Sequence, residues 1–252
     1  MNTLPASVLV LGSGALKIGQ AGEFDYSGAQ ALKVLRQAGI RSILVNRNIA
    51  TVQTSEGMAD RTFFLPVEPS TVLPILEQER PEGILLSFGG QTALNCGLAL
   101  ARGGHLERLG IRVLGTPVET IVATEDRQAF ASLMRREQLP VARSGAAATV
   151  PEAERLSREL GFPLILRTAF SLGGEGSRIC HTPHQVRHAA HLALKRSGQV
   201  LLEEYLGGWK EVEYEVLRDA AGNSITVCNM ENMDPMGIHT GESVVVAPSQ
   251  TL

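Results

Sequence analysis

Residues 7–12, Ser-Val-Leu-Val-Leu-Gly, form a short apolar run that is rich in β-branched residues and ends in glycine. This pattern is typical of a buried parallel strand. Similar runs follow at 42–45, 83–87 and 111–115, and helical patterns lie between them at 28–38, 70–79 and 92–102. Strands that alternate with helices predict βαβ units around a mostly parallel sheet. We therefore expect residues 1–118 to form one doubly wound α/β domain.

The pattern changes after Pro117. A helix is predicted over 124–138, with Thr124 as its N-cap and acidic residues in its first turn. Strands and helices then mix in one series of segments, at 141–144, 151–160, 163–168, 184–196, 199–204, 211–218 and 224–230, with turns at 207–208 and 219–223. This mixture predicts a separate α+β domain over 119–252. The chain stops soon after the apolar run 244–246, so we expect this second domain to be incomplete.

The bulk composition predicts a folded globular protein. The 252 residues carry a net charge of −3 with a pI of about 6.1, and 44% of them are hydrophobic. This balance argues against a nucleic-acid-binding protein, which usually presents a basic field. No apolar run approaches the roughly 20 residues that span a bilayer, and no secretory signal is visible. Cys96, Cys180 and Cys228 lie far apart without metal-binding spacing, which indicates reduced thiols in a cytoplasmic protein.

A glycine cluster follows the first predicted strand, where α/β sheets bind ligands. Its sequence is Gly12-Ser-Gly14-Ala-Leu-Lys-Ile-Gly19. The third glycine comes too late for a dinucleotide fingerprint, and Gln20 stands where a P-loop has lysine. The cluster is either a tight turn or a ligand loop, and the polar residues between Gln20 and Ser27 favour the loop. Residues 89–92 and 46–54 leave the same choice between an anion site and a turn with a helix cap.

The second region holds a more informative glycine loop. Arg167 ends a predicted strand, and Gly173-Gly174-Glu175-Gly176 follows. Consecutive glycines let backbone N–H groups approach a polyphosphate, and a nearby guanidinium pairs with phosphate oxygens. Arg127 is a second candidate cation. The alternative is an ordinary hairpin turn.

Acidic residues alternate downstream. Glu211, Glu213 and Glu215 are predicted to share one strand face, where they bind cations or sugar hydroxyls or form a solvated edge. A polar, glycine-punctuated loop over 229–243 then contains His239, which is either structural or part of a site.

Several motifs in this order resemble one family. They are Ile18–Gly28, Glu125-Asp-Arg127, Arg167 with Gly-Gly-x-Gly, Gly-Trp-Lys-Glu211 and Met-Gly-Ile-His-Thr-Gly-Glu242. Together they resemble the N-terminal, carboxyphosphate half of the carbamoyl-phosphate synthetase large subunit. The resemblance covers essentially all 252 residues. It implies a pre-ATP-grasp domain over 1–118 and the N-terminal part of an ATP-grasp domain over 119–252.

The resemblance implies an ATP-dependent ligase. ATP would phosphorylate bicarbonate to carboxyphosphate, which ammonia from glutamine would convert to carbamate and then, in a second half, to carbamoyl phosphate. The resemblance also implies a role for individual residues. In the nucleotide site, Arg127 and Arg167 would contact the ATP phosphates and the bound anion, Gly173 and Gly174 the polyphosphate, Glu204 and Leu206 the adenine edge, and Glu211 the ribose. Gly237, Ile238 and His239 would line the bicarbonate and transferred-phosphate site, Asn232 and Asp234 would bind a monovalent cation such as K⁺, and Glu23 and Glu213 would lie along internal tunnels.

Some features depart from the family pattern. Glu175 and Arg178 replace small residues in the glycine loop, and Arg47 stands where proline is usual. The ligands of Mg²⁺ or Mn²⁺ are expected beyond Leu252, so we expect the chain to be inactive alone. The implied partner is a small glutamine amidotransferase subunit or domain, and the full-length protein would be a candidate homo-oligomer. The alternative is a non-catalytic, nucleotide-binding regulatory module. The choice between arginine and pyrimidine synthesis stays open.

Overall fold

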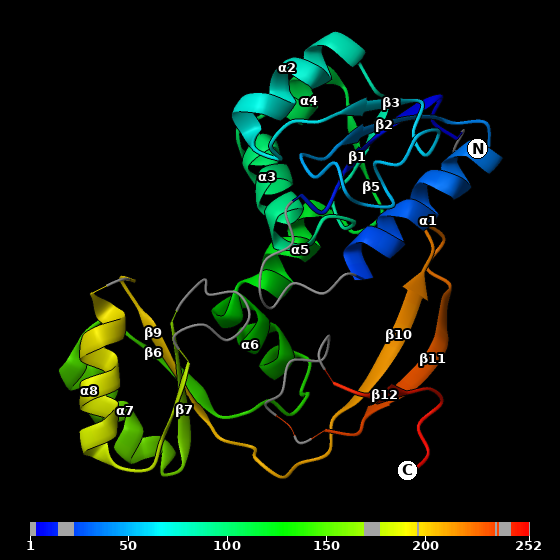
Figure 1. The fold of residues 1–252 in the computed structure, drawn as a ribbon. Helices are drawn as coiled ribbons and strands as arrows, with labels where there is room; N and C mark the ends of the chain where they lie inside the picture. The colour runs from blue at the N-terminus through cyan, green and yellow to red at the C-terminus, as the bar shows by residue number, and fades with distance from the viewer. Residues whose placement is uncertain are drawn as a thin grey trace. The chain divides into compact units, whose positions relative to one another are not determined.

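The computed structural model describes residues 4–14, 23–168, 177–195, 197–234, 236 and 243–251, without the side chains of residues 23, 127, 128 and 168. The chain divides into two compact units, Met1–Leu139 and Pro140–Leu252 (Figure 1). The predicted domain boundary at residue 118 is a different division and stays a prediction. No described helix combines the length and apolarity needed to cross a bilayer.

The first unit is built on a parallel five-stranded sheet. Its strands are β1 (Ser7–Leu11), β2 (Arg41–Val45), β3 (Arg61–Phe63), β4 (Gly83–Leu85) and β5 (Arg112–Leu114), in the order β3-β2-β1-β4-β5. All four pairings are parallel, which confirms the predicted sheet. The first quoted run of the sequence is thus the central strand, and residues 8–11 are fully buried.

Helices cover both faces of this sheet. They are α1 (Glu23–Gln37) on one face and α2 (Pro69–Glu79), α3 (Gly90–Arg102), α4 (His105–Leu109) and α5 (Val118–Glu125) on the other. The first unit also contains α6 (Arg127–Arg136), which follows α5. Successive side chains of a strand point to opposite faces, so Val8 and Val10 pack with Leu32 of α1. Leu9 and Leu11 pack in the core that α2 to α5 cover. The doubly wound class is therefore confirmed.

The predicted helix over 124–138 is wrong at its start. Thr124 lies in the last turn of α5, where its hydroxyl donates to the Thr120 carbonyl at 2.9 Å. The chain bends at Asp126, whose Oδ1 accepts a hydrogen bond from the Ala129 N–H at 2.8 Å. The capping residue of α6 is therefore Asp126, because a carboxylate at this position satisfies an N–H that has no partner inside the helix.

The second unit contains an antiparallel four-stranded sheet with two helices. The elements are β6 (Ser144–Ala147), α7 (Val150–Leu160), β7 (Leu164–Thr168), β8 (Arg178–Cys180), α8 (Pro183–Leu194) and β9 (Val200–Glu204), with the strands ordered β6-β9-β7-β8. The strand predicted at 141–144 is displaced to 144–147. Both helices begin alike, because Thr149 and Thr182 accept hydrogen bonds from the N–H groups three residues later.

A second sheet follows in the same unit, with β10 (Val212–Arg218), β11 (Ser224–Asn232) and β12 (Val245–Val246) in that order (Figure 1). The predicted turn at 219–223 is confirmed, since Asp219 Oδ1 accepts from the N–H groups of Ala221 and Asn223. The hairpin of β10 and β11 exposes large apolar side chains, namely Tyr214, Val216, Leu217, Ile225 and Val227.

The predicted run of three aligned carboxylates is only partly confirmed. Glu213 and Glu215 lie two apart on β10 and share a face, but Glu211 precedes the strand. A bulge between Glu215 and Val216 then shifts the register against β11. Glu211 is held by a backbone hydrogen bond, because its carbonyl accepts from the Asn232 N–H.

Candidate functional site

Arg167 lies on β7, beside Glu203 of the neighbouring strand β9. The guanidinium Nη2 and the Glu203 Oε1 are 3.5 Å apart, and one-third of the arginine side chain is exposed. The Nε of Arg167 is buried and has no hydrogen-bond partner among the residues that the structure describes. A buried N–H without a partner is costly, so this guanidinium has unused capacity to donate to an anion. The sequence did not identify Glu203 as the residue that orients Arg167.

Glu204, the next residue of β9, has its carboxylate occupied by Arg143. Its Oε1 accepts from the Arg143 backbone N–H at 3.0 Å, and its Oε2 accepts from Arg143 Nε at 2.8 Å. The backbone hydrogen bond, followed by the side-chain one, lowers the pKa of Glu204. Arg143 also donates to the Leu160 carbonyl at 3.0 Å. The Glu204 N–H also donates to the Arg143 carbonyl at 2.9 Å, so Arg143 engages both the carboxylate and the backbone N–H of Glu204.

Leu206, two residues after β9, accepts a hydrogen bond through its carbonyl from the Trp209 N–H at 3.1 Å. This contact closes the turn at Gly207 and Gly208 that the sequence predicted. Gly208 has a φ of 84°, a conformation that glycine adopts without strain. The turn leads the chain directly into Lys210 and Glu211.

Glu211, Glu213 and Asn232 meet where β10 begins and β11 ends. The Asn232 N–H donates to the Glu211 carbonyl at 3.1 Å, and Asn232 Nδ2 donates to Glu213 Oε1 at 2.9 Å. The Oδ1 of Asn232 is buried and accepts no hydrogen bond from any described residue. The predicted ribose residue and one predicted cation ligand are therefore adjacent.

Asp234 and Ser243 add oxygen atoms near this point. Asp234 Oδ2 accepts from the Val244 N–H at 2.8 Å, and the Val244 carbonyl accepts from the Met233 N–H at 2.9 Å. The Ser243 hydroxyl oxygen is buried and, within the described part of the chain, unpartnered. Carboxylate, amide and hydroxyl oxygens are ligands that hard cations prefer. The donor set thus fits a cation, and Ser243 is a residue that the sequence prediction missed.

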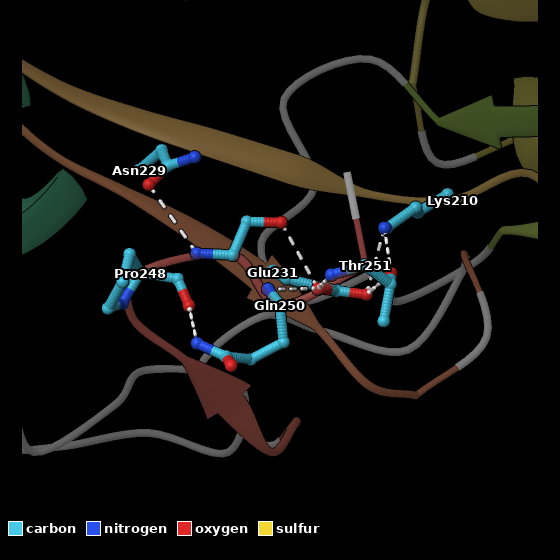
Figure 2. A network of polar contacts seen from close by, with 7 residues as sticks. Lys210, Asn229, Glu231, Pro248, Gln250 and Thr251 are labelled. Atoms are coloured by element: carbon cyan, nitrogen blue, oxygen red, sulfur yellow. Dashed lines mark hydrogen bonds and ion pairs between the residues drawn. The ribbon is translucent and has the colours of Figure 1, made fainter.

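Glu231 is the centre of the polar network shown in Figure 2. Its side chain is 5% exposed, and Lys210 Nζ lies 3.0 Å from its Oε1. Its Oε2 accepts from the backbone N–H groups of Gln250 and Thr251 at 2.9 and 3.1 Å and from Ser249 Oγ at 3.1 Å. The hydrogen bond from the Thr251 hydroxyl is the largest cause that lowers the pKa of Glu231 to about 2, followed by that from Lys210.

In the first unit, the glycine cluster adjoins a buried polar group. Gln53 is fully buried; its Nε2 donates to the Phe24 carbonyl at 2.7 Å, and its Oε1 accepts from Asn46 Nδ2 at 3.2 Å. A Cβ on Gly28 would lie 2.2 Å from Gln53 Nε2, so this glycine leaves the space that the amide fills. The segment 46–54 therefore forms an internally bonded support, a structural role that the sequence had left open.

The two glycine loops at the carboxyl ends of β1 and β4 are in close contact. A Cβ on Gly89 would lie 2.1 Å from the carbonyl oxygen of Gly12. Backbone therefore meets backbone between these loops.

Several predicted site residues lie outside the described residues: Gly173, Gly174, Glu175, Gly237, Ile238 and His239. Arg127 begins α6 and Glu23 begins α1, but the structure does not describe their side chains. The roles given to these residues stay predictions.

A surface cavity of about 390 Å³ lies on α8, and none of its lining residues is a predicted site residue. Its lining consists of Val150, His184, Arg187, His188 and His191.

Two family models together match nearly the whole chain. The model described as the carbamoyl phosphate synthase preATP-grasp domain matches residues 5–123. The model described as the carbamoyl-phosphate synthase L chain, ATP binding domain, matches residues 126–252.

Relatives of known name are much longer than this chain. The carbamoyl phosphate synthase arginine-specific large chain of Eremothecium gossypii is 55% identical over 246 residues, which are 98% of this chain and 22% of that protein. Multifunctional protein pyr1-3 of Dictyostelium discoideum is 56% identical over 245 residues, 97% of this chain and 11% of that protein. The chain thus spans about a fifth or a tenth of these relatives.

Solved structures share the fold at lower identity. The biotin carboxylase domain of Hydrogenobacter thermophilus 2-oxoglutarate carboxylase, with MgADP, ADP and bicarbonate, has a TM-score of 0.71 at 24% identity and covers 91% of this chain and 51% of that one. The ADP complex of PurK, N5-carboxyaminoimidazole ribonucleotide synthetase, has a TM-score of 0.69 at 18% identity, with 92% and 55% covered. Since the ATP-binding family model alone matches half of the residues, this chain belongs to the carbamoyl-phosphate synthase large-chain family.

Proposed function

We propose that this chain provides the carboxyphosphate-forming nucleotide site of a glutamine-dependent carbamoyl-phosphate synthetase. ATP phosphorylates bicarbonate, ammonia converts the carboxyphosphate to carbamate, and a second ATP-dependent step gives carbamoyl phosphate. The observation that carries the proposal is Arg167, whose buried Nε lacks a partner among the described residues, in a chain that matches an ATP-binding family model. A guanidinium held by Glu203 on one side is prepared to receive a phosphate on the other.

The second unit carries all the proposed nucleotide contacts except Arg127, which begins α6 in the first unit. Arg167 would neutralise phosphate charge, together with Arg127, Gly173 and Gly174. The adenine edge would meet the chain at Glu204 and Leu206, where Arg143 already holds the carboxylate and the backbone N–H of Glu204. Glu211 would accept the ribose hydroxyls. The remaining predicted contacts are to the bicarbonate and transferred phosphate, from Gly237, Ile238 and His239, and to internal tunnels, from Glu23 and Glu213.

The chemistry asks mainly for positioning and charge neutralisation. Phosphoryl transfer places negative charge on the γ-phosphate oxygens, and bicarbonate already carries its nucleophilic oxygen. His239 would therefore act as a donor to developing charge and not as a base. Mg²⁺ or Mn²⁺, bound with the nucleotide, would neutralise part of the phosphate charge.

A monovalent cation such as K⁺ is proposed beside Glu211. Asn232 and Asp234 would hold it, and the unpartnered oxygens of Asn232 and Ser243, as far as the described residues go, support this placement. A cation there would offset the negative charge of Glu211, Glu213 and Asp234.

The partners and setting follow from the proposed reaction. A glutamine amidotransferase subunit or domain would supply the ammonia, and the complete protein would be cytoplasmic. One relative, the arginine-specific large chain of Neurospora crassa, is named as mitochondrial. Homo-oligomer formation stays a prediction for the complete protein.

The second candidate is a non-catalytic nucleotide-binding regulatory module of the same family. Both candidates predict nucleotide binding by this chain. They differ in the complete polypeptide, where only the enzyme hydrolyses ATP in a bicarbonate-dependent reaction. We expect this chain alone to show no such ATPase.

The test is calorimetric binding of MgADP to the wild-type chain and to Arg167→Ala. We expect saturable binding that weakens about tenfold in the variant, since a charge-assisted contact to phosphate is lost. Arg155→Ala is the matched control, because Arg155 pairs with Glu159 on an exposed face of α7. Equal affinity of the wild type and Arg167→Ala would contradict the role of Arg167, and absence of wild-type binding would contradict the nucleotide site.

A further inference from the structure

Glu231 has more partners than an ordinary ion pair. Its Oε1 contacts Lys210 Nζ and the Thr251 hydroxyl, and its Oε2 accepts from Ser249, Gln250 and Thr251 (Figure 2). Lys210 also donates to the Thr251 hydroxyl. One carboxylate therefore joins the segment before β10, the end of β11 and residues 249–251.

An ion pair with a buried carboxylate, such as Glu231 with the partly exposed Lys210, is a poor source of stability by itself. Removing a carboxylate and an ammonium from water has a large desolvation cost, and apolar replacements are often as stable. A buried charged network is best attested where it fixes the relative placement of elements. The Glu231 network is therefore expected to fix the positions of the residues next to it.

Two predicted site residues directly follow the two members of the ion pair in the sequence. Lys210 directly precedes Glu211, and Glu231 directly precedes Asn232. The register pairs Glu231 with Val212, so the Lys210 contact crosses between the two strands where β10 starts. The Asn232 N–H then bonds the Glu211 carbonyl at 3.1 Å. The ion pair is thus one residue away from both members of that contact.

We propose that Glu231 is a positioning residue for the nucleotide site. Through Lys210 and residues 249–251 it fixes Glu211 against Asn232, so that the ribose-binding carboxylate and the cation-binding amide form one unit. This inference rests on the proposed function of Glu211 and Asn232. It predicts that nucleotide affinity and its dependence on K⁺ change together when the network is broken, although Glu231 touches neither ligand.

The test compares Glu231→Gln, Lys210→Met and the double variant by MgADP calorimetry, in KCl and in choline chloride of equal ionic strength. Each single variant should raise the Kd for MgADP about tenfold and should reduce the K⁺ dependence of binding. The double variant should differ from the singles by less than about twofold, because both changes break one network. Glu159→Gln, in the exposed pair with Arg155, is the control and should leave both quantities unchanged.

A Glu231 network that only stabilises the fold gives a different result. Glu231→Gln would then lower the unfolding temperature measured by circular dichroism, while the Kd and its K⁺ response stay at wild-type values. That outcome overturns the inference. Lys210→Met keeps the test decisive if Glu231→Gln fails to fold, since the lysine side chain is 35% exposed and its loss leaves the other donors to Glu231 in place.

Failure of the proposed function can be recognised separately. If the wild-type chain binds no MgADP, the nucleotide proposal fails, and hydrogen exchange decides the positioning proposal. Breaking the network in Lys210→Met should increase exchange of the Asn232 amide, which bonds Glu211 and not Glu231. Unchanged protection of that amide would show that Glu231 does not position Asn232.

Discussion

Arg143 and Glu204 are joined by three hydrogen bonds across the edge of a sheet. The Glu204 carboxylate accepts from the backbone N–H and from Nε of Arg143, and the Glu204 N–H donates to the Arg143 carbonyl at 2.9 Å. Because Arg143 also bonds the last carbonyl of α7, it connects three chain segments where β9 ends. Glu204 and Leu206, the residues predicted to contact adenine, lie at and just after this end of β9.

Replacement of Arg143 should therefore affect recognition of the base. Arg143→Met removes the Nε donor but keeps the backbone hydrogen bonds, so the fold is retained. We expect about a fivefold loss of MgADP affinity and weaker discrimination between ADP and IDP, because the Glu204 peptide is less well fixed. Calorimetry with both nucleotides measures this. Arg155→Met serves as the control, and an unchanged ratio of the two affinities would contradict the prediction.

Gly89→Ala should strongly destabilise the first unit. The added Cβ would lie 2.1 Å from the Gly12 carbonyl oxygen, which belongs to backbone and not to a flexible side chain. We expect a loss of at least about 2 kcal/mol in the free energy of unfolding. Urea unfolding followed by circular dichroism measures the loss. Gly198→Ala is the control, since no described heavy atom lies within 4 Å of its Cβ position. Equal stability of the two variants would show that the loops of Gly12 and Gly89 can move apart at little energetic cost.

The acid sensitivity of the fold should depend on Glu231. Its pKa is lowered from 4.5 to about 2, first by the Thr251 hydroxyl and then by Lys210. Between these values the unfolded chain binds more protons than the folded one, so stability rises with pH in this window. The contribution is fully present above about pH 5 and is lost as pH falls toward 2. The difference in urea midpoint between wild type and Glu231→Gln should shrink over this range. If the difference between the two urea midpoints stayed constant from pH 5 to pH 2, the predicted role of Glu231 in acid sensitivity would be wrong.

The Cys96 thiol should resist alkylation in the folded protein. Its side chain is buried, and burial raises its pKa to about 12, so the reactive thiolate is scarce at pH 8. Cys228 is partly exposed and should react first with iodoacetamide. Peptide mass spectrometry with and without urea measures both sites. Comparable alkylation of Cys96 and Cys228 without urea would contradict the expected protection.

The sequence was most informative where structure depends on local patterns. Apolar runs and helical periodicity located β1, β2, β4 and β5 and the helices α1, α2 and α3, but not α4, which lies between β4 and β5. They missed β3, whose three residues include Arg61 and form no apolar run. Thr124 was a plausible N-cap by type, but Asp126 is equally suitable, and tertiary packing of α5 selected it.

The site was less predictable because its contacts are distant in sequence. Arg143 and Glu204 are 61 positions apart, and Glu213 and Asn232 are 19 apart. These pairs depend on antiparallel register, which local spacing does not define. The family resemblance named Glu204, Glu211 and Asn232 but gave no reason to choose Glu231, Ser243 or Glu203. These three emerge only when strands and the segments beside them are placed together.

The exposed apolar side chains of the β10–β11 hairpin have a practical consequence for measuring the thermal stability of this chain. Dyes that fluoresce on hydrophobic surfaces should bind Tyr214, Val216, Leu217, Ile225 and Val227 in the native state. The signal would then be high before heating and would hide part of the transition. Circular dichroism reports the backbone and avoids this artefact. For this chain the choice of optical probe therefore decides how much of a variant's unfolding transition is seen.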